Sequence, residues 1–206
     1  MITLPAMTVT IPAADFVVED VIGCGNRLLG GIEINYWDNL LQTSIIPSLA
    51  SKGVTPAALP LFLFGNVVMY DTIASNCCIL GYHNAYTASG KLQTYANAMY
   101  DNSGAFSGSG DISALSHEIG EWMDDPNTVN PAQPWGNVGQ VSGCQNNLEV
   151  GDPLSGTVFN DTLNGKTYHP QELAFYSWFY HQTPSEGVNG WYSNQGTFRA
   201  SAAPCP

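Results

Sequence analysis

The clearest chemical pattern in the sequence lies at residues 115–126, which read LSHEIGEWMDDP. If this segment is helical, His117 and Glu121 are one turn apart and project from the same face. An imidazole and a carboxylate in that arrangement can bind one divalent ion at about 2.0–2.2 Å. Glu118 follows the first of these two ligands and is placed to take a proton from a metal-activated water as general base. The spacing therefore predicts a metal-binding helix that also carries a base.

The charges around this segment favour the same interpretation. Between Lys91 and Lys166 the chain has no lysine or arginine. Carboxylates gathered without a cation repel one another, so a bound metal ion would neutralise them. A solvated acidic helix end is the alternative. The ionisable side chains concerned are Asp111, His117, Glu118, Glu121, Asp124 and Asp125.

A zinc site needs a third protein ligand. We expect it from residues 148–153, LEVGDP, where Glu149 and Asp152 are the candidates. Asp125 is a weaker candidate, and an Asp-Pro turn beside an exposed glutamate is the alternative for the other two. Zn²⁺ is the expected metal, and a ligand set this rich in carboxylates also admits Ca²⁺ or Mn²⁺.

The elements that must position these residues can be predicted from periodicity. The metal-binding helix is expected at residues 112–123, with Asp111 or Ser113 as its N-cap and Pro126 ending it. The apolar face expected to enter the core comprises Leu115, Ile119 and Trp122.

Upstream, the patterns predict a strand at 7–18, a helix at 35–52 that Pro47 kinks, a strand or hairpin at 61–70, and paired strands at 77–86 and 93–100. Downstream, we expect a long loop at 127–151 and a helix at 170–181. Strands followed by helices indicate an α+β fold, with a small mixed sheet packed on the metal-binding helix and long loops. One domain is expected over residues 1–206.

The overall charge excludes some partners. The 206 residues include 5 lysines and arginines against 17 aspartates and glutamates, a formal net charge of −12. So few cations cannot neutralise a run of phosphates, which excludes nucleic acid and disfavours anionic membrane surfaces. The longest apolar run, at residues 57–70, is interrupted and too short to cross a bilayer.

The composition also suggests a compartment. Few lysines and arginines with abundant Asn, Ser, Gly and Tyr are typical of a secreted bacterial or fungal protein, although the N-terminal residues show no secretion signal. Of the five cysteines we expect two disulfides and one free thiol, with five reduced thiols as the alternative. A bridge from Cys205 would hold the chain end in place.

Three motifs together resemble a known group. SHEIGEWMDDP, the later Trp135 and LEVGDP are similar to a pattern in secreted bacterial zincin-like metallopeptidases and, more distantly, in the plant EXORDIUM (phosphate-induced) extracellular family. The resemblance covers roughly residues 60–155. It implies a zincin-like fold, metal ligands at His117, Glu121 and one or both of Glu149 and Asp152, and a general base at Glu118. Cys144 precedes LEVGDP here, whereas the plant proteins carry a cysteine just after it, so their disulfide pairing does not transfer.

The function expected from these residues is that of a secreted, monomeric zinc endopeptidase acting on protein or peptide substrates. His169 is our candidate for stabilising the oxyanion, with Tyr168, Tyr176, Tyr82 and His83 as alternatives. A second hypothesis is a catalytically silent zincin-fold protein with a structural metal, whose aromatic residues, such as Trp178, Trp191 and Tyr192, bind sugars. A third is a metal-free glycan hydrolase that uses paired carboxylates.

Overall fold

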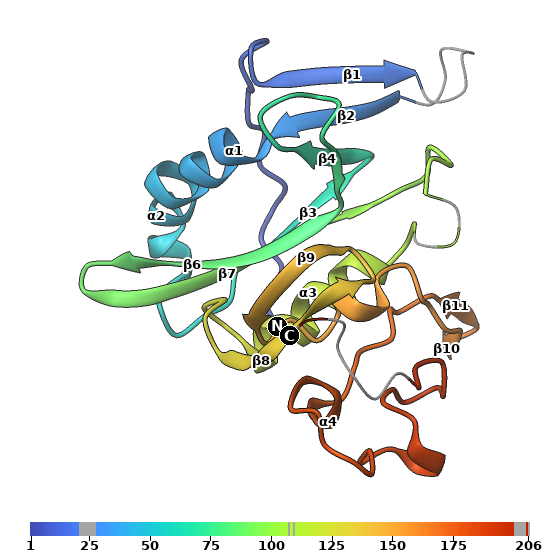
Figure 1. Cartoon of the computed structure of the whole chain (residues 1–206). Helices are drawn as coiled ribbons and strands as arrows, with labels where there is room; N and C mark the ends of the chain where they lie inside the picture. The colour runs from blue at the N-terminus through green and yellow to red at the C-terminus, as the bar shows by residue number, and fades with distance from the viewer. Residues whose placement is uncertain (21–27, 107, 109, 200–204, 206) are drawn as a thin grey trace.

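The computed structural model describes residues 1–20, 28–106, 108, 110–199 and 205 (Figure 1). Its first sheet has the order β1-β2-β4-β5, in which only the β2–β4 pair is parallel. The second has the order β3-β7-β6, with β3 parallel and β6 antiparallel to β7. Two further hairpins are β8–β9 and β10–β11.

The bounds of the strands are Phe16–Asp20 (β1), Leu28–Glu33 (β2), Leu61–Gly65 (β3), Val67–Tyr70 (β4), Cys77–Ile79 (β5), Gly81–Ala88 (β6), Lys91–Tyr100 (β7), Pro131–Val138 (β8), Val141–Asn147 (β9), Asp161–Leu163 (β10) and Lys166–Tyr168 (β11). The main helices are Ile34–Leu40 (α1), Ile46–Ser48 (α2), Ser113–Asp124 (α3) and Tyr176–Phe179 (α4). Strands with few helices, largely segregated along the chain, make the fold α+β, as the sequence predicted.

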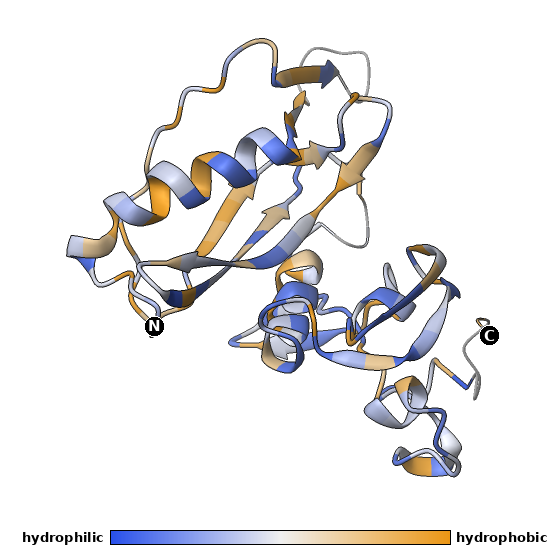
Figure 2. Cartoon of the chain, turned by 60° about the vertical axis from the view of Figure 1, so that its left-hand side comes forward, coloured by the Kyte–Doolittle hydropathy of each residue, from blue (hydrophilic) through white to orange (hydrophobic). Residues whose placement is uncertain are grey.

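The helix predicted at residues 35–52 forms as one continuous right-handed segment in which the hydrogen-bond spacing changes. A π-helical stretch, Leu41–Ile45, connects α1 to α2. Pro47 is the second residue of α2, and its missing N–H and its ring disturb regular α-helical bonding to the preceding turn. Hydrophobic and hydrophilic residues alternate along the segment (Figure 2). Its apolar side packs on β7 through a cluster that includes Trp37, Leu41, Ile45 and Tyr95.

The two faces of β7 pack against different helices. Tyr95 and Asn97 point toward α1, where Trp37 donates a hydrogen bond to Asn97 Oδ1 and Tyr95 donates one to Asp38. Alternate residues of a strand point to opposite faces, and Thr94 accordingly accepts a hydrogen bond from Trp122 of α3. The sheet therefore lies between α1 and α3 (Figures 1 and 2).

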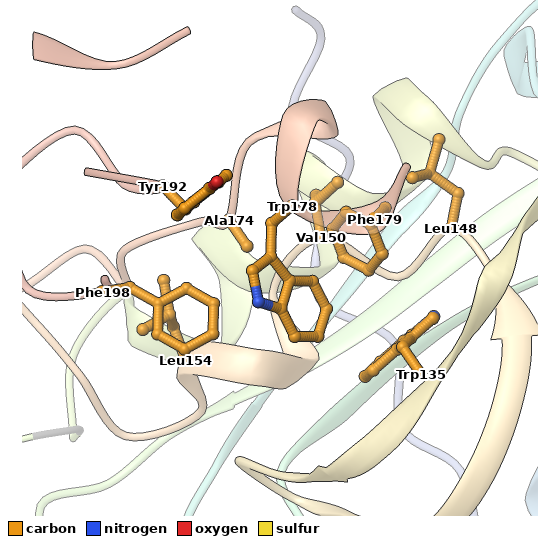
Figure 3. Close-up of a cluster of buried hydrophobic side chains, with 9 residues drawn as sticks. All are labelled: Trp135, Leu148, Val150, Leu154, Ala174, Trp178, Phe179, Tyr192 and Phe198. Carbon is orange, nitrogen blue, oxygen red and sulfur yellow. The ribbon is translucent and has the colours of Figure 1, made fainter. Parts of the chain in front are cut away.

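A second core forms in the C-terminal part of the chain. Trp135 of β8 makes edge-to-face contacts with Trp178 and Phe179 of α4, with ring centroids 5.2–5.6 Å apart (Figure 3). Leu148 and Val150, which follow β9, are buried in the same cluster. Because these residues alternate with Glu149, the packing of the core fixes the position of the segment that carries the expected third ligand.

Several local predictions were wrong. Residues 127–151 are mostly the β8–β9 hairpin rather than a loop. Within 170–181, only Tyr176–Phe179 is helical, because Gln171 and Ala174 bridge to other extended segments. Within 61–70, β3 and β4 belong to different sheets and form no hairpin. Of the strand expected at 7–18, only the part from Phe16 onward is a strand.

The cysteine prediction is supported for four residues. Cys144 pairs with Cys205, so the end of the chain is tied to β9, and Cys77 pairs with Cys78. Cys24, the expected free thiol, lies outside the described residues. None of the described helices is both long and apolar enough to cross a membrane.

Candidate metal centre

Small residues let α3 approach the sheet closely. Gly81 of β6 pairs with Ala98 of β7, and His83 pairs with Ala96, so these four residues share the face that meets α3. A Cβ placed on Gly81 would lie 2.9 Å from Cγ of Glu118 and 2.7 Å from the Asn97 carbonyl oxygen. Any larger residue at position 81 would therefore prevent α3 from packing this closely against the sheet.

The buried face of α3 is its polar face, which corrects the sequence prediction. His117, Glu118 and Glu121 are 6%, 5% and 3% exposed, whereas Leu115, Ile119 and Trp122 are only half-buried. Burying ionisable groups is costly unless each has a partner. The structure shows partners for these three groups on two sides of the helix.

One group of ligand-type side chains consists of His117, Glu121 and Asp152, and one ligand atom from each lies within 4.8 Å of the others. Nε2 of His117 is 3.0 Å from Oε2 of Glu121 and 3.5 Å from Oδ1 of Asp152. Gln140 also donates a hydrogen bond to that Asp152 oxygen. The structure thus brings together both predicted helix ligands and one of the two predicted loop ligands.

The loop after β9 shapes this group through its backbone. The N–H groups of Gly151 and Asp152 donate to Oε1 of Glu121 at 3.0 and 3.2 Å, which leaves Oε2 directed at His117. A Cβ on Gly151 would lie 2.6 Å from Nδ1 of His117. Gly151 is therefore the residue that lets the loop pass against the imidazole.

Gln171 holds the other side of the His117 ring, and sequence reasoning missed it. Its amide nitrogen lies 2.7 Å from Nδ1 of His117 and donates to the Gly151 carbonyl oxygen at 2.9 Å. A histidine that binds a metal through Nε2 donates its Nδ1–H to an acceptor, so metal binding would require the Gln171 amide to turn its oxygen toward Nδ1. In the sequence, Gln171 lies two residues after the candidate His169. The segment 170–181 was predicted to be helical, and that prediction gave no reason to expect Gln171 beside His117.

A second group shares one member with the first. His83, Glu118 and Glu121 also offer ligand atoms within 4.8 Å of one another. Nδ1 of His83 is 3.3 Å from Oε2 of Glu118 and 3.7 Å from Oε2 of Glu121. The sequence identified His83 only as an alternative oxyanion partner, because a single histidine in a strand has no spacing pattern of its own.

Glu149 and Asp125 lie at the edge of this second group. Oε2 of Glu149 is 3.8 Å from Nε2 of His83. Asp125 uses Oδ1 to accept the N–H groups of Val129 and Asn130. The remaining oxygens, Oε2 of Glu149 and Oδ2 of Asp125, are buried without a hydrogen-bond partner. Partnerless buried carboxylate oxygens are rare in folded proteins and call for a cation or a proton.

The pKa values of the clustered side chains are shifted because many carboxylates and few cations are buried together. Burial, with the nearby charge of Glu121, raises the pKa of Glu149 against the opposing pull of His83. Burial and Glu121 likewise raise the pKa of Asp152, although His117 opposes them. Burial lowers the pKa of His117, but Glu121 and Asp152 outweigh it and raise that pKa well above its usual value. In the described part of the chain, every ion pair has histidine as its cation.

The expected oxyanion residues are occupied elsewhere. Nδ1 of His169 lies 3.0 Å from Asp111, ahead of the first turn of α3, and His169 belongs to neither of the two groups found among the described residues. Tyr82 donates to Asp38, on the α1 side of the sheet, and Tyr176 donates to Asp124. The sugar-binding alternative loses two of its aromatic residues, because Trp178 and Tyr192 are buried in the core of Figure 3.

Comparison with known proteins identifies no relative: no family model, no curated protein and no solved structure matches the chain.

Proposed function

We propose that this protein is a metal-dependent endopeptidase whose metal ion is held by His117, Glu121 and Asp152. The main support for the proposal is that these three side chains are buried and have their ligand atoms close together, with Glu118 beside them on α3. The group has three ligand atoms on elements that Gly151 and Gln171 lock in place, which is the number a catalytic zinc site uses.

The donor chemistry fits a divalent cation. One imidazole and two carboxylates give a formally neutral site with Zn²⁺, and no lysine or arginine between Lys91 and Lys166 competes for the carboxylates. When bound, such an ion acidifies water and polarises the carbonyl group that is attacked. Ca²⁺ is the alternative ion, because the set is rich in oxygen donors.

Glu118 performs the proton transfer in this proposal. Its carboxylate takes a proton from the attacking water as the water oxygen bonds to the peptide carbonyl carbon. It then delivers that proton to the amide nitrogen as the C–N bond breaks. Burial of Glu118 beside the ligands keeps competing bulk water away from the carboxylate. His169 remains our candidate for stabilising the oxyanion, and it must turn from Asp111 to do so.

Peptide substrates and a secreted location rest on the motif resemblance to zincin-like metallopeptidases. The Cys144–Cys205 pair is compatible with an oxidising compartment. We therefore place the protein outside the cell, as a monomer acting on protein substrates.

The decisive experiment compares Glu118→Gln with wild type after chelator treatment and reloading with one equivalent of Zn²⁺. We expect wild type to bind zinc and to cleave casein in a chelator-sensitive manner. Glu118→Gln should retain the zinc and lose at least 100-fold in cleavage rate, the range of general-base catalysis. The matched control is Glu19→Gln, an exposed carboxylate on β1, which should behave as wild type. Equal cleavage by Glu118→Gln and wild type would contradict the proposal.

A structural metal without catalysis is the second candidate function, and one contact favours it. Oε2 of Glu118 lies 3.3 Å from His83, so the expected base already has a partner. This candidate predicts that zinc raises the thermal midpoint of unfolding while casein and other unfolded proteins stay intact in every metal form.

A further inference from the structure

A single carboxylate oxygen faces both histidines of the buried cluster. Oε2 of Glu121 lies 3.0 Å from Nε2 of His117 and 3.7 Å from Nδ1 of His83. Its other oxygen is fixed by the N–H groups of Gly151 and Asp152. The side chain therefore presents one oxygen to two separate ligand groups, as a carboxylate oxygen shared between two cations would.

One nitrogen of the His83 ring is fixed by the main chain, and the other faces two carboxylates. Its Nε2 lies 2.9 Å from the main-chain carbonyl oxygen of Asp125, which can only accept, so Nε2 carries a hydrogen. Nδ1 faces Oε2 of Glu118 at 3.3 Å and Oε2 of Glu121 at 3.7 Å. A divalent cation bound at this place would take the position of a proton on Nδ1 and would be held by that nitrogen and the two carboxylate oxygens.

A further carboxylate lies at the opposite edge of the His83 ring and has an oxygen without a hydrogen-bond partner. Glu149 is 7% exposed, and its Oε2 has no hydrogen bond although it lies 3.8 Å from the His83 ring. Asn147 fixes only the other oxygen, Oε1, at 2.8 Å. The unpartnered oxygen adds negative charge beside the group of His83, Glu118 and Glu121, which a cation bound there would offset.

We propose that a second divalent cation binds between His83, Glu118 and Glu121, with Glu121 shared between the two ions. The inference rests on the proposed function for the first ion. It adds a regulatory consequence: because the second ion occupies Glu118, it withdraws the general base. Zinc at one equivalent should therefore activate hydrolysis, and excess zinc should inhibit it.

Two residues allow the two proposed cation sites to be tested separately. Asp152 belongs to the first group alone and His83 to the second alone. We would titrate Zn²⁺ into chelator-stripped wild type, His83→Gln and Asp152→Asn by calorimetry, with circular dichroism to check folding. Glutamine at position 83 can still donate to the Asp125 carbonyl. Should His83→Gln not fold, Glu118→Gln removes a ligand of the second position while leaving all three ligands of the first. His181→Gln, an exposed histidine, is the matched control.

We expect two zinc ions per chain in wild type and in His181→Gln, and one in His83→Gln, Glu118→Gln and Asp152→Asn. Inhibition of casein cleavage by excess zinc should disappear in His83→Gln. A stoichiometry of one in both wild type and His83→Gln would overturn the second position and leave the proposed function standing. Two zinc ions without cleavage would support the second position while overturning the peptidase. No zinc in wild type would overturn both.

Discussion

At Gly151 the main chain passes so close to the His117 ring that one methyl group would displace the imidazole. A Cβ there would lie 2.6–2.8 Å from Nδ1, Cε1 and Cγ of His117, well inside van der Waals contact. Unlike many glycines in this chain, Gly151 has an ordinary helical φ of −85°. Its requirement is therefore space alone, and a substitution tests the site without adding backbone strain.

We expect Gly151→Ala to weaken zinc binding 10–100-fold, the effect of losing the support of a metal ligand. The physical reason is that His117 must rotate away from Glu121 and Asp152 to admit the methyl group. Competition with a chromogenic chelator measures the change. Gly53→Ala is the control, because that glycine has a φ of +94° and open space around its Cβ position. It should lose stability and keep its zinc affinity. An unchanged affinity in Gly151→Ala would remove His117 from the ligands.

Among the helices and strands, the sequence correctly predicted those that are determined by interactions between residues close together in the chain. Helix α3 was predicted within one residue of its start and end, because Pro126 and the 3.6-residue period fix it. The pairing of β6 with β7 was likewise predicted, although the first residues of the strand expected at 77–86 form β5 and pair with β4 in the other sheet. By contrast, the β8–β9 hairpin is rich in glycine and asparagine and has no alternating pattern. Burial of Trp135 against α4 holds it, and that contact is invisible in the sequence.

The same division holds for the site. The i,i+4 spacing predicted His117 and Glu121, the segment LEVGDP offered Glu149 and Asp152, and the motif resemblance implied the same ligands. His83 and Gln171 could not be predicted as partners, because strand pairing and an isolated bridge bring them to α3. Periodicity also assigned the wrong face of α3 to the core. It counts apolar residues, and here paired ionisable groups are the more deeply buried.

The bend after β7 makes a pH-dependent contribution that can be measured. Asp101 accepts the N–H groups of Ser103 at 2.7 Å and Phe106 at 2.9 Å. Partial burial raises the pKa of Asp101, but these donors outweigh it and lower the pKa below the usual 3.8. A lowered folded-state pKa stabilises the protein above the unfolded-state value, and the effect is lost as pH falls through the folded-state value.

We therefore expect Asp101→Asn to lower the free energy of unfolding at pH 7 by on the order of 1 kcal/mol. The difference from wild type should begin to shrink below about pH 4, where the carboxyl of the unfolded chain takes up a proton before that of the folded protein does. Urea unfolding at pH 7 and pH 3 tests this, with the exposed Asp161→Asn as control. A constant difference at both pH values would show that the ionised carboxylate is not the source.

The Cys144–Cys205 bridge ties β9 to the end of the chain across a sequence separation of 61. Chain entropy for such a loop predicts a loss of about 4 kcal/mol when the bridge is removed. We expect this from the double variant Cys144→Ser/Cys205→Ser in urea unfolding. The matched control is Cys77→Ser/Cys78→Ser, whose bridge spans a separation of one and closes no long loop. Equal losses in the two variants would contradict an entropic origin.

The electrostatic free energy of the whole molecule is set mainly by its excess of acidic over basic side chains. With 17 aspartates and glutamates against 5 lysines and arginines, repulsion is distributed over the chain and is densest where α3 meets the loop after β9. Within the described ranges, histidine is the only cation in the ion pairs. Added salt therefore has much repulsion and little attraction to screen.

We expect the chelator-treated protein to become more stable as NaCl rises from 0.01 to 0.15 M, because the screening length falls from about 30 Å to about 8 Å. A gain of about 1 kcal/mol would raise the midpoint of thermal unfolding by roughly 2–4 °C for a chain of this size. Zinc-loaded protein should gain less, since the bound cations already neutralise the buried carboxylates, which salt screens poorly. Differential scanning calorimetry of both forms measures the two slopes. A midpoint that falls with salt in the metal-free form would mean that attractive pairs, rather than repulsion, dominate the electrostatics of the fold.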